Sequence, residues 1–261
     1  MLIDTHCHLN FSCYQADLEK VIDRAKKDDV RKIICVGSNI KDSRTAFELA
    51  KKFPGVIYPA VGIHPQKTDP KNTDSIEEQI NQLKILCRKP GIVGIGECGL
   101  DFSDPPQNEE KRNTVDQMKL FQMQIEMAKE FSLPLVIHSR KAFFDTIDVM
   151  HKYSGLKGVF HCYSGGKSWI KEVAQMGFFF GVDGNITYDA GLMNVYREIP
   201  IERIILETDS PFLAPLPYRR KRNEPKNVRM VAQKIAEIKN IPLKNLISQV
   251  EKNTNELFSL C

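Results

Sequence analysis

Short runs rich in β-branched and other apolar residues alternate with longer amphipathic runs along almost the whole 261-residue chain. In the longer runs the apolar residues return at helical spacing. Leu18, Val21 and Ile22, for example, fall on one face of a helix predicted over Asp17–Lys27. Because alternating strands and helices build a parallel sheet covered by those helices, the pattern predicts an α/β fold. The predicted strands are Leu2–His6, Lys32–Gly37, Val56–Ile63, Gly91–Gly96, Leu133–His138, Lys157–His161, Phe178–Gly181 and Arg203–Glu207.

Helical periodicity joins these strands and continues after the last of them. Eight strands with intervening helices, and no linker or low-complexity tract, predict a single (β/α)8 TIM barrel with C-terminal helices, one domain over residues 1–261. A doubly wound open sheet is the alternative, but no Gly-x-Gly-x-x-Gly follows the first strand. The predicted helices are Asp17–Lys27, Lys41–Phe53, Ser75–Cys87, Glu109–Phe131, Lys141–Tyr153, Ser168–Met176, Gly191–Ile199, Val228–Ile238 and Leu243–Phe258.

The composition bears on the compartment more than on the activity. Seven cysteines without a Cys-x-x-Cys pair favour a reducing compartment over a disulfide framework. No basic-then-apolar leader opens the chain, and no apolar run approaches the ~18 residues of a membrane span, so we expect a soluble, cytoplasmic protein with no membrane partner. The net charge of +4 permits a polyanionic substrate without requiring one. We expect a monomer, because no long exposed apolar helix is evident.

Five of the six histidines fall at predicted carboxyl ends of strands, where the chemistry of such barrels is located. His6 and His8 close the first strand, and their i, i+2 spacing directs both side chains to the same side of an extended backbone. The other three, His64, His138 and His161, close the third, fifth and sixth strands. Composition alone would not concentrate them there, so we expect these imidazoles to converge on one site.

Two acidic residues complete this pattern. Glu97 follows the fourth predicted strand among several glycines, and Asp209 lies just past the eighth. Four histidines and two carboxylates suit a pair of divalent ions bridged by one carboxylate, for which Glu97 is the central candidate. Imidazoles favour zinc, manganese or iron, whereas carboxylates and phosphate oxygens also accept magnesium, so Mg, Mn and Zn all remain open. The predicted metal ligands are His6, His8, Glu97, His138, His161 and Asp209.

Several neighbouring residues have two interpretations. His64 precedes a proline and is either a substrate contact or a strand-end residue held by that proline. Asp101 either caps the turn after the fourth strand or takes part in catalysis. Glu207 either orients a ligand histidine or pairs with an arginine. Three cysteines beside ligands are predicted to point away from the site and pack in the core: Cys7, Cys98 and Cys162.

These residues lie in sequence blocks that resemble, in order and spacing, the signature blocks of the TatD family. The resemblance runs from about residue 2 to Pro225 and on through the C-terminal helices. It implies a metal-dependent deoxyribonuclease of the amidohydrolase-like barrel superfamily, with the same six ligands as above. The blocks are Thr5–Leu9, Gly62–Pro65, Gly94–Asp101, Pro134–Arg140, His161–Gly165 and Glu207–Pro211.

One stretch departs from the family pattern. Before Asn223-Glu224-Pro225, where the family has a glycine after its first arginine, this chain has Arg220 within the basic run 219–222. If the turn needs a positive φ, Arg220 costs about 1 kcal/mol or more, or the loop differs. A loop after the eighth strand of a barrel commonly binds phosphate, so the basic run either contacts phosphates or is a solvated charge run.

The predicted function is hydrolysis of DNA phosphodiester bonds, as a 3′–5′ exonuclease, by a water activated between two metal ions. Asp209 is the predicted general base as well as a ligand, and Glu97 the bridging catalytic residue. Stacking of a terminal base on Tyr163 or Phe102 would favour single-stranded or frayed DNA ends, although either aromatic residue could equally be a wall of the barrel mouth. The predicted substrate contacts are His64, Arg140, Tyr163 and Arg222.

Two alternatives belong to other functional classes. The first is metal-dependent hydrolysis of another substrate, such as an aminoacyl ester, a cyclic amide or a phosphoester. Many barrel amide hydrolases bridge their metals with a carboxylated lysine at the fourth strand, and Gly94–Phe102 contains no lysine. The second is a non-enzymatic metal-binding or nucleic-acid-binding protein, against which the intact set of predicted ligands argues.

Overall fold

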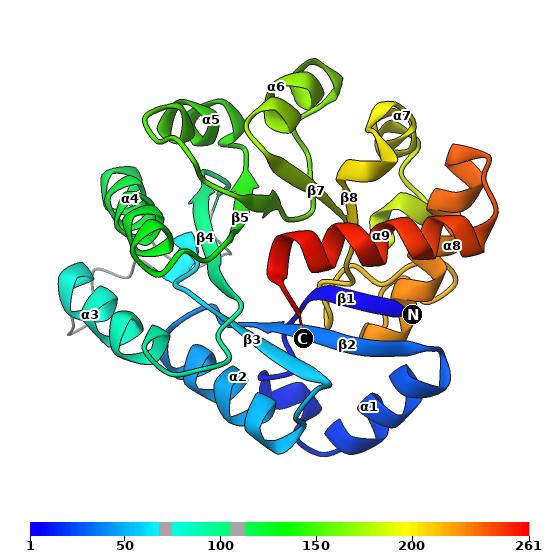
Figure 1. Cartoon of the computed structure of the whole chain (residues 1–261), viewed down its shortest axis with the longest axis horizontal. Coiled ribbons are helices and arrows are strands. Elements are labelled where there is room, and N and C mark those ends of the chain that lie inside the picture. The colour runs from blue at the N-terminus through cyan, green and yellow to red at the C-terminus, as the bar shows by residue number, and fades with distance from the viewer. Residues whose placement is uncertain (68–74, 105–112, 261) are drawn as a thin grey trace.

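Eight parallel strands form one sheet in the order β1 to β8, each paired with its sequence neighbours (Figure 1). The structure is a computed structural model that describes residues 1–67, 75–104 and 113–260. The strands curve into a nearly closed barrel with helices between them, which confirms the predicted TIM barrel. Their bounds are β1 Leu2–Cys7, β2 Val30–Val36, β3 Ile57–Val61, β4 Gly94–Asp101, β5 Leu135–Arg140, β6 Gly158–Phe160, β7 Phe178–Val182 and β8 Ile204–Leu206.

The helices surround the strands and begin where capping residues predict. The side chains of Asn39, Ser75 and Asn113 each accept a backbone N–H of the first helical turn that follows them. The predicted start of the fourth helix, Glu109, lies outside the described residues. No helix within the described ranges is long and apolar enough to cross a membrane. The helices are α1 Leu18–Lys27, α2 Ile40–Lys52, α3 Ile76–Cys87, α4 Thr114–Phe131, α5 Phe143–His151, α6 Ile170–Gln175, α7 Ala190–Glu198, α8 Val228–Lys239 and α9 Leu243–Phe258.

The barrel closes between β1 and the segment that follows β8. Asp4 accepts the backbone N–H of Thr208 at 2.9 Å and its hydroxyl at 2.6 Å. The N–H of Asp209 donates to the carbonyl of His6 at 2.9 Å, and the N–H of His8 donates to the carbonyl of Ser210 at 2.7 Å. These hydrogen bonds set Asp209 beside the two histidines of β1, although two hundred residues separate them in the chain.

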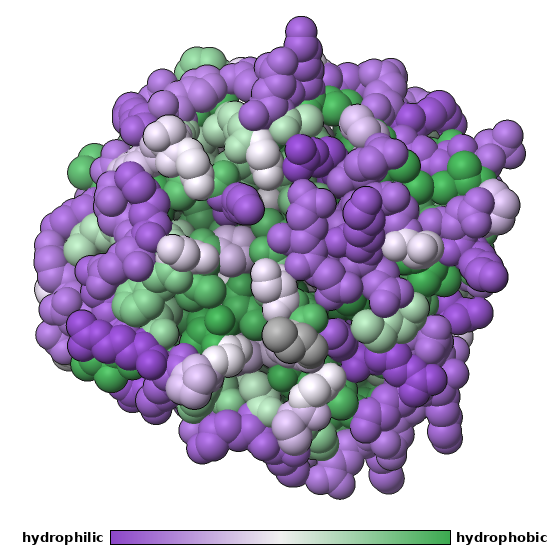
Figure 2. All heavy atoms as spheres, in the orientation of Figure 1, coloured by the Kyte–Doolittle hydropathy of each residue, from purple (hydrophilic) through white to green (hydrophobic). Residues whose placement is uncertain are grey.

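The interior of the barrel is filled by strand residues and by the C-terminal segment. Leu257, Phe258 and Leu260 pack against inward-facing residues of seven strands, such as Val136 and Phe179. In Figure 1 the chain after α9 runs toward the middle of the ring of strands. Figure 2 shows the same face, with hydrophobic residues visible near its centre and hydrophilic ones over most of its periphery. This apolar plug occupies the amino end of the barrel, which leaves the carboxyl end for polar side chains.

β4 differs from the strand predicted at this place. The strand is predicted to end before Glu97, but it runs on to Asp101 because Cys98–Asp101 pair with Ile137–Arg140 of β5. The register shifts between Ile95 and Cys98, so the stretch between them bulges and Glu97 lies in the middle of the strand. A bulge re-aims a side chain, and here it directs a carboxylate into the barrel mouth.

Candidate metal centre

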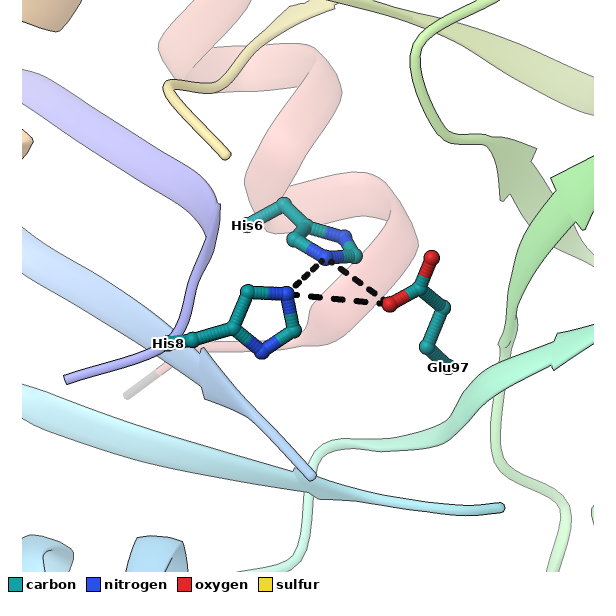
Figure 3. A group of neighbouring side chains, drawn as sticks. All are labelled: His6, His8 and Glu97. Atoms are coloured by element: carbon teal, nitrogen blue, oxygen red, sulfur yellow. Dashed lines mark hydrogen bonds and ion pairs between the residues drawn. The ribbon is translucent and has the colours of Figure 1, made fainter. Parts of the chain in front are cut away.

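Six side chains from five strands meet at the carboxyl end of the barrel. They come from β1, the middle of β4, β5, the end of β6 and the segment after β8, and four of the six are at most 6% exposed as whole residues. Figure 3 shows three of them, His6, His8 and Glu97, with their ring nitrogens and carboxylate turned toward one another. The six are the predicted ligands His6, His8, Glu97, His138, His161 and Asp209.

One set of four atoms surrounds a single point. Nε2 of His6 lies 3.2 Å from Nε2 of His8, 3.5 Å from Oε2 of Glu97 and 3.6 Å from Oδ1 of Asp209. Nε2 of His8 lies 3.7 Å from the same Glu97 oxygen and 3.4 Å from the same Asp209 oxygen. Ligand atoms bound tetrahedrally at about 2.0–2.2 Å lie about 3.3–3.6 Å apart. The spacing of His6, His8 and Glu97 therefore fits one divalent ion, and Oδ1 of Asp209 lies at ligand spacing from both histidine nitrogens.

The second oxygen of Glu97 faces a different set of nitrogens. Its Oε1 lies 2.8 Å from Nδ1 of His138 and 3.8 Å from Nε2 of His161. Glu97 thus presents Oε2 to the histidines of β1 and Oε1 to those of β5 and β6. Both sets combine imidazole and carboxylate donors, a mixture that fits zinc, manganese or iron.

The outer nitrogens of three histidines have polar partners that orient the rings. Nδ1–H of His8 donates to the carbonyl of Val36 at 3.0 Å. Nε2 of His138 lies 3.2 Å from Oδ2 of Asp101. With the proton of His8 on Nδ1, the lone pair of its Nε2 points at the site. Asp101 does more than cap a turn, because its carboxylate holds the ring of His138 from the side opposite Glu97.

Glu207 has the corresponding relation to His161. Its Oε1 lies 2.9 Å from Nδ1 of His161, an ion-pair distance, and accepts the backbone N–H of Cys162 at 2.6 Å. Of the two interpretations from sequence, the structure thus favours orientation of a ligand histidine. Among the described residues, Nδ1 of His6 has no polar partner, and Nδ1 of His161 has the ion pair with Glu207 but no hydrogen bond of standard geometry.

The two candidate acidic ligands are ionised at neutral pH although they are buried. Burial opposes ionisation of Glu97, but the surrounding histidines, including His138 and His6 through hydrogen bonds, hold its pKa well below the ordinary value. Burial likewise opposes ionisation of Asp209, and its contact with His8 lowers its pKa. Both carboxylates are therefore in the form that binds a cation.

Protons are expected to compete with metal for this site. Burial alone would lower the histidine pKa values, but carboxylate partners raise those of three candidate ligands: His8, His138 and His161. A raised pKa favours the protonated ring, which cannot bind metal, so affinity should fall as pH drops from about 8 to about 6. Calorimetric titration with zinc or manganese in buffers of different ionisation enthalpy should show proton release on binding. Affinity and proton release that do not change over this pH range would contradict the expectation.

Gly99 lets β4 and β5 approach closely beneath the site. Its φ is +135°, and a Cβ at this position would lie 2.0 Å from the carbonyl oxygen of His138. Any side chain would push β5 away, and with it a candidate ligand. Gly99 thus allows the close approach of the two backbones that brings Glu97 and His138 together.

His64 lies at the centre, where the strand-end pattern places it. Its Nε2 is 3.5 Å from Oε1 of Glu97, within reach of a ligand position. However, its Nδ1 accepts the N–H of Gln66 at 3.1 Å, and burial lowers its pKa to about 3. A neutral ring that accepts at Nδ1 carries its proton on Nε2, so His64 presents a donor to the site rather than a lone pair. This fits the predicted substrate contact better than ligation.

Of the other predicted substrate contacts, Arg140 is accessible to a substrate and Tyr163 is not. Arg140 is the last residue of β5 and its side chain is exposed at the rim of the site. Tyr163 is 2% exposed, packs edge-to-face against Phe180 and donates its hydroxyl to the carbonyl of Gly166. Tyr163 is a core residue, so the prediction that it stacks on a base is wrong.

The prediction that Arg222 contacts the substrate directly is also wrong, because its guanidinium is already engaged within the protein. Its guanidinium donates to both carboxylate oxygens of Asp17, at 2.9 and 2.7 Å, and lies over the ring of Tyr14. These contacts tie the loop after β8 to the start of α1. Arg220, in contrast, has a φ of +69°, so the turn does need the left-handed conformation that the sequence comparison with the family pattern anticipates.

Asp183 is a buried acid beside this region that sequence reasoning missed. It follows β7 directly, is 3% exposed, and accepts the N–H of Asn185 at 2.7 Å. Burial raises the pKa of Asp183 to about 7, against its contact with the thiol of Cys162. The signal was available, because Asp183 directly follows β7 just as Glu207 directly follows β8, where Val182 pairs with Leu206.

The chain matches known proteins over almost its whole length. The family model described as TatD related DNase matches residues 3–259. An uncharacterized metal-dependent hydrolase of Bacillus subtilis, YabD, is 36% identical over 264 aligned positions that cover all of both chains. Human deoxyribonuclease TATDN3 is 31% identical over 98% of this chain and 94% of its own.

A solved structure agrees with these matches. That of YJJV, a TATD homolog from Escherichia coli, superimposes with a TM-score of 0.90 over 100% of this chain and 98% of its own, at 27% identity. The family match spans the strands that carry all six candidate ligands. On this evidence the chain belongs to the TatD family.

Proposed function

We propose that this protein is a metal-dependent deoxyribonuclease that removes nucleotides from the 3′ end of single-stranded or frayed DNA. The observation that carries the proposal is Glu97, whose two oxygens face two separate sets of ring nitrogens. Such a pair of cation positions is typical of enzymes that displace a leaving group from phosphorus. The name of the human relative, a deoxyribonuclease, supports DNA as the substrate class.

The roles of the residues follow from their placement. His6, His8 and Asp209 would hold one divalent ion, His138 and His161 the other, with Glu97 between them. When bound, such ions lower the pKa of water and offset negative charge on the phosphate oxygens and the departing 3′-oxygen.

Asp209 is also the proposed general base. It is ionised at neutral pH, because contact with His8 lowers its pKa against the opposing effect of burial. We assign to it the acceptance of a proton from the water that attacks phosphorus.

Two further side chains can position the substrate. The Nε2–H of His64 points into the site from the segment after β3 and is suited to donate to a phosphate oxygen. The exposed guanidinium of Arg140 at the end of β5 can form paired hydrogen bonds with the same or the next phosphate. Neither group has to change its protonation state, so both act by orientation.

Cleavage of end-labelled DNA tests the proposal directly. Metal-stripped protein is resupplied with magnesium, manganese or zinc and incubated with 5′- or 3′-labelled single-stranded and duplex oligonucleotides, with Glu97→Ala as the inactive control. We expect metal-dependent loss of nucleotides from the 3′ end, faster on single strands, and no cleavage by the variant. Bound metal without cleavage under any of these conditions would contradict the nuclease assignment and favour hydrolysis of a small ester or amide. Analytical ultracentrifugation of the same sample checks the expected monomer.

A further inference from the structure

A second cavity opens beside the metal centre, under the loop that follows β8. It has a volume of about 580 Å³ and is lined by Cys13, Tyr188, Phe212 and the basic run 219–222, among other residues. We call it the loop pocket. Nothing in the metal centre described above uses it, and its position next to the candidate ligands makes it a candidate for the rest of a long substrate.

The aromatic wall of the loop pocket reaches the metal centre. The ring of Phe212 is 50% exposed, and its centroid lies 6.3 Å from that of His8. Phe11, stacked on His8 at 4.7 Å, meets Phe212 edge-on at 6.2 Å. A large, half-exposed ring next to a candidate ligand offers a stacking surface to a flat group bound at the centre. Phe212 is therefore placed to stack on a base, the role that the sequence analysis predicted for Tyr163.

The other wall of the loop pocket is positively charged. Four consecutive lining residues, 219–222, are basic, and none of the lining residues is acidic. The guanidinium of Arg222 forms an ion pair with Asp17. The guanidinium of Arg219 lies 4.4 Å from the centroid of the Tyr188 ring. Arg220 and Lys221 are exposed, and the ammonium of Lys221 lies 6.0 Å from the centroid of the Tyr218 ring. A wall of this charge complements an anion, and an aromatic ring beside it complements a base.

The loop is held firmly enough to present these groups in one arrangement. Asn223 is fully buried, and its side-chain amide donates to the carbonyls of Thr208 and Phe212 at 2.9 and 2.8 Å. Its own N–H donates to the carbonyl of Pro211. One residue thereby joins the end of the basic run to the segment that carries Asp209, which couples the loop pocket to the metal centre.

We infer that the loop pocket binds an unpaired nucleotide of the DNA strand, next to the phosphodiester that lies at the metal centre. The base stacks on Phe212, and the following phosphate lies against Arg220 and Lys221. The inference rests on the proposed nuclease function and adds to it a site that selects unpaired strands, because a base inside a duplex cannot present its face to the ring.

Binding measured without catalysis tests the inference. Metal-stripped protein in excess chelator is titrated with a short fluorescent single strand at several salt concentrations. Phe212→Leu keeps an apolar side chain but loses the ring, and should weaken binding about tenfold. Arg220→Gly fits the φ of +69° without strain, so it removes the charge while keeping the turn. It should weaken binding and reduce the slope of log affinity against log salt by about 0.7.

A matched control separates local from general charge effects. Arg88→Gly removes an exposed arginine at the C-cap of α3, at the opposite end of the barrel, and should leave both affinity and salt slope unchanged. Circular dichroism melting shows whether each variant is folded. Cleavage by the wild-type protein, supplied with metal, is measured in parallel.

The exposed thiol of Cys13 provides a second readout in the unmodified protein. It lines the loop pocket, whereas Cys7, Cys35, Cys87 and Cys98 are buried. A saturating single strand should slow alkylation of Cys13, followed by mass spectrometry of its peptide. Duplex DNA with blunt, stable ends should protect it less.

The outcomes separate this inference from the proposed function. Wild-type cleavage together with unaltered binding in Phe212→Leu and Arg220→Gly, or with unprotected Cys13, would overturn the loop pocket and leave the nuclease in place. Equal competition by inorganic polyphosphate, with no effect of Phe212→Leu, would also overturn it, because only charge would then be recognised. A wild-type protein that neither cleaves nor binds DNA would remove both proposals.

Discussion

Replacement of Glu97 by glutamine is expected to abolish hydrolysis and to release metal from both positions. Glutamine has nearly the same shape, so the change removes charge and little else. One carboxylate oxygen faces the histidines of β1 and the other faces His138, so a neutral amide weakens both cation positions at once. Its NH2 group would also point a donor at one of them. We expect a fall of about a thousandfold or more in kcat/KM.

Elemental analysis and steady-state kinetics on the same preparation measure this effect. Metal content should fall toward zero in Glu97→Gln after dialysis against a weak chelator. Glu48→Gln, on the exposed surface of α2 and 61% exposed, is the matched control and should keep wild-type metal and activity. Full metal content with lost activity would show that Glu97 acts in catalysis without holding the ions. Retained activity would contradict the bridging role altogether.

Asp209→Asn should lower kcat by about 10²–10⁴-fold while leaving the fold intact. The backbone of Asp209 has a φ of +53°, a conformation that asparagine tolerates well. The variant therefore keeps the loop geometry and the hydrogen bond of its N–H to the carbonyl of His6. It loses the charge that faces Nε2 of His6 and His8, and with it the proposed proton acceptor.

A comparison with alanine separates chemistry from backbone strain. Asp209→Ala should lose activity to the same extent, but it should also unfold more easily, since alanine at positive φ costs about 1–2 kcal/mol. Metal analysis of Asp209→Asn should show about half the wild-type content, because the His138 side of the site retains Glu97. Unchanged kcat in Asp209→Asn would exclude this residue as the general base and leave it as a ligand at most.

The barrel itself could be predicted from local patterns. Apolar periodicity distinguishes strands from helices within about a dozen residues, and the order of eight alternating units leaves few ways to fold. The strand-end rule then selected residues that lie close together in the structure, such as His6, Glu97 and Asp209. The need for positive φ at Arg220 was also visible, because it stands where a glycine was expected.

Other features depend on contacts between residues far apart in the chain. The bulge of β4 places Glu97 inside the strand, and no local pattern announces a register shift against β5. The orientations of the histidine rings depend on partners such as Asp101 and the carbonyl of Val36, which come from other strands. Tyr163 and Phe212 are both aromatic residues near strand ends, yet one is buried and the other half exposed.

The sequence by itself therefore determined the type of fold, the order of its elements and the residues available for the metal centre. Periodicity and strand ends are local properties that a single chain displays directly. Only the tertiary structure decided which oxygen of Glu97 faces which histidines, that His64 is a donor, and that Arg222 is engaged with Asp17. Those outcomes depend on strand register and loop packing, where a shift of one residue exchanges the side chains that face the site.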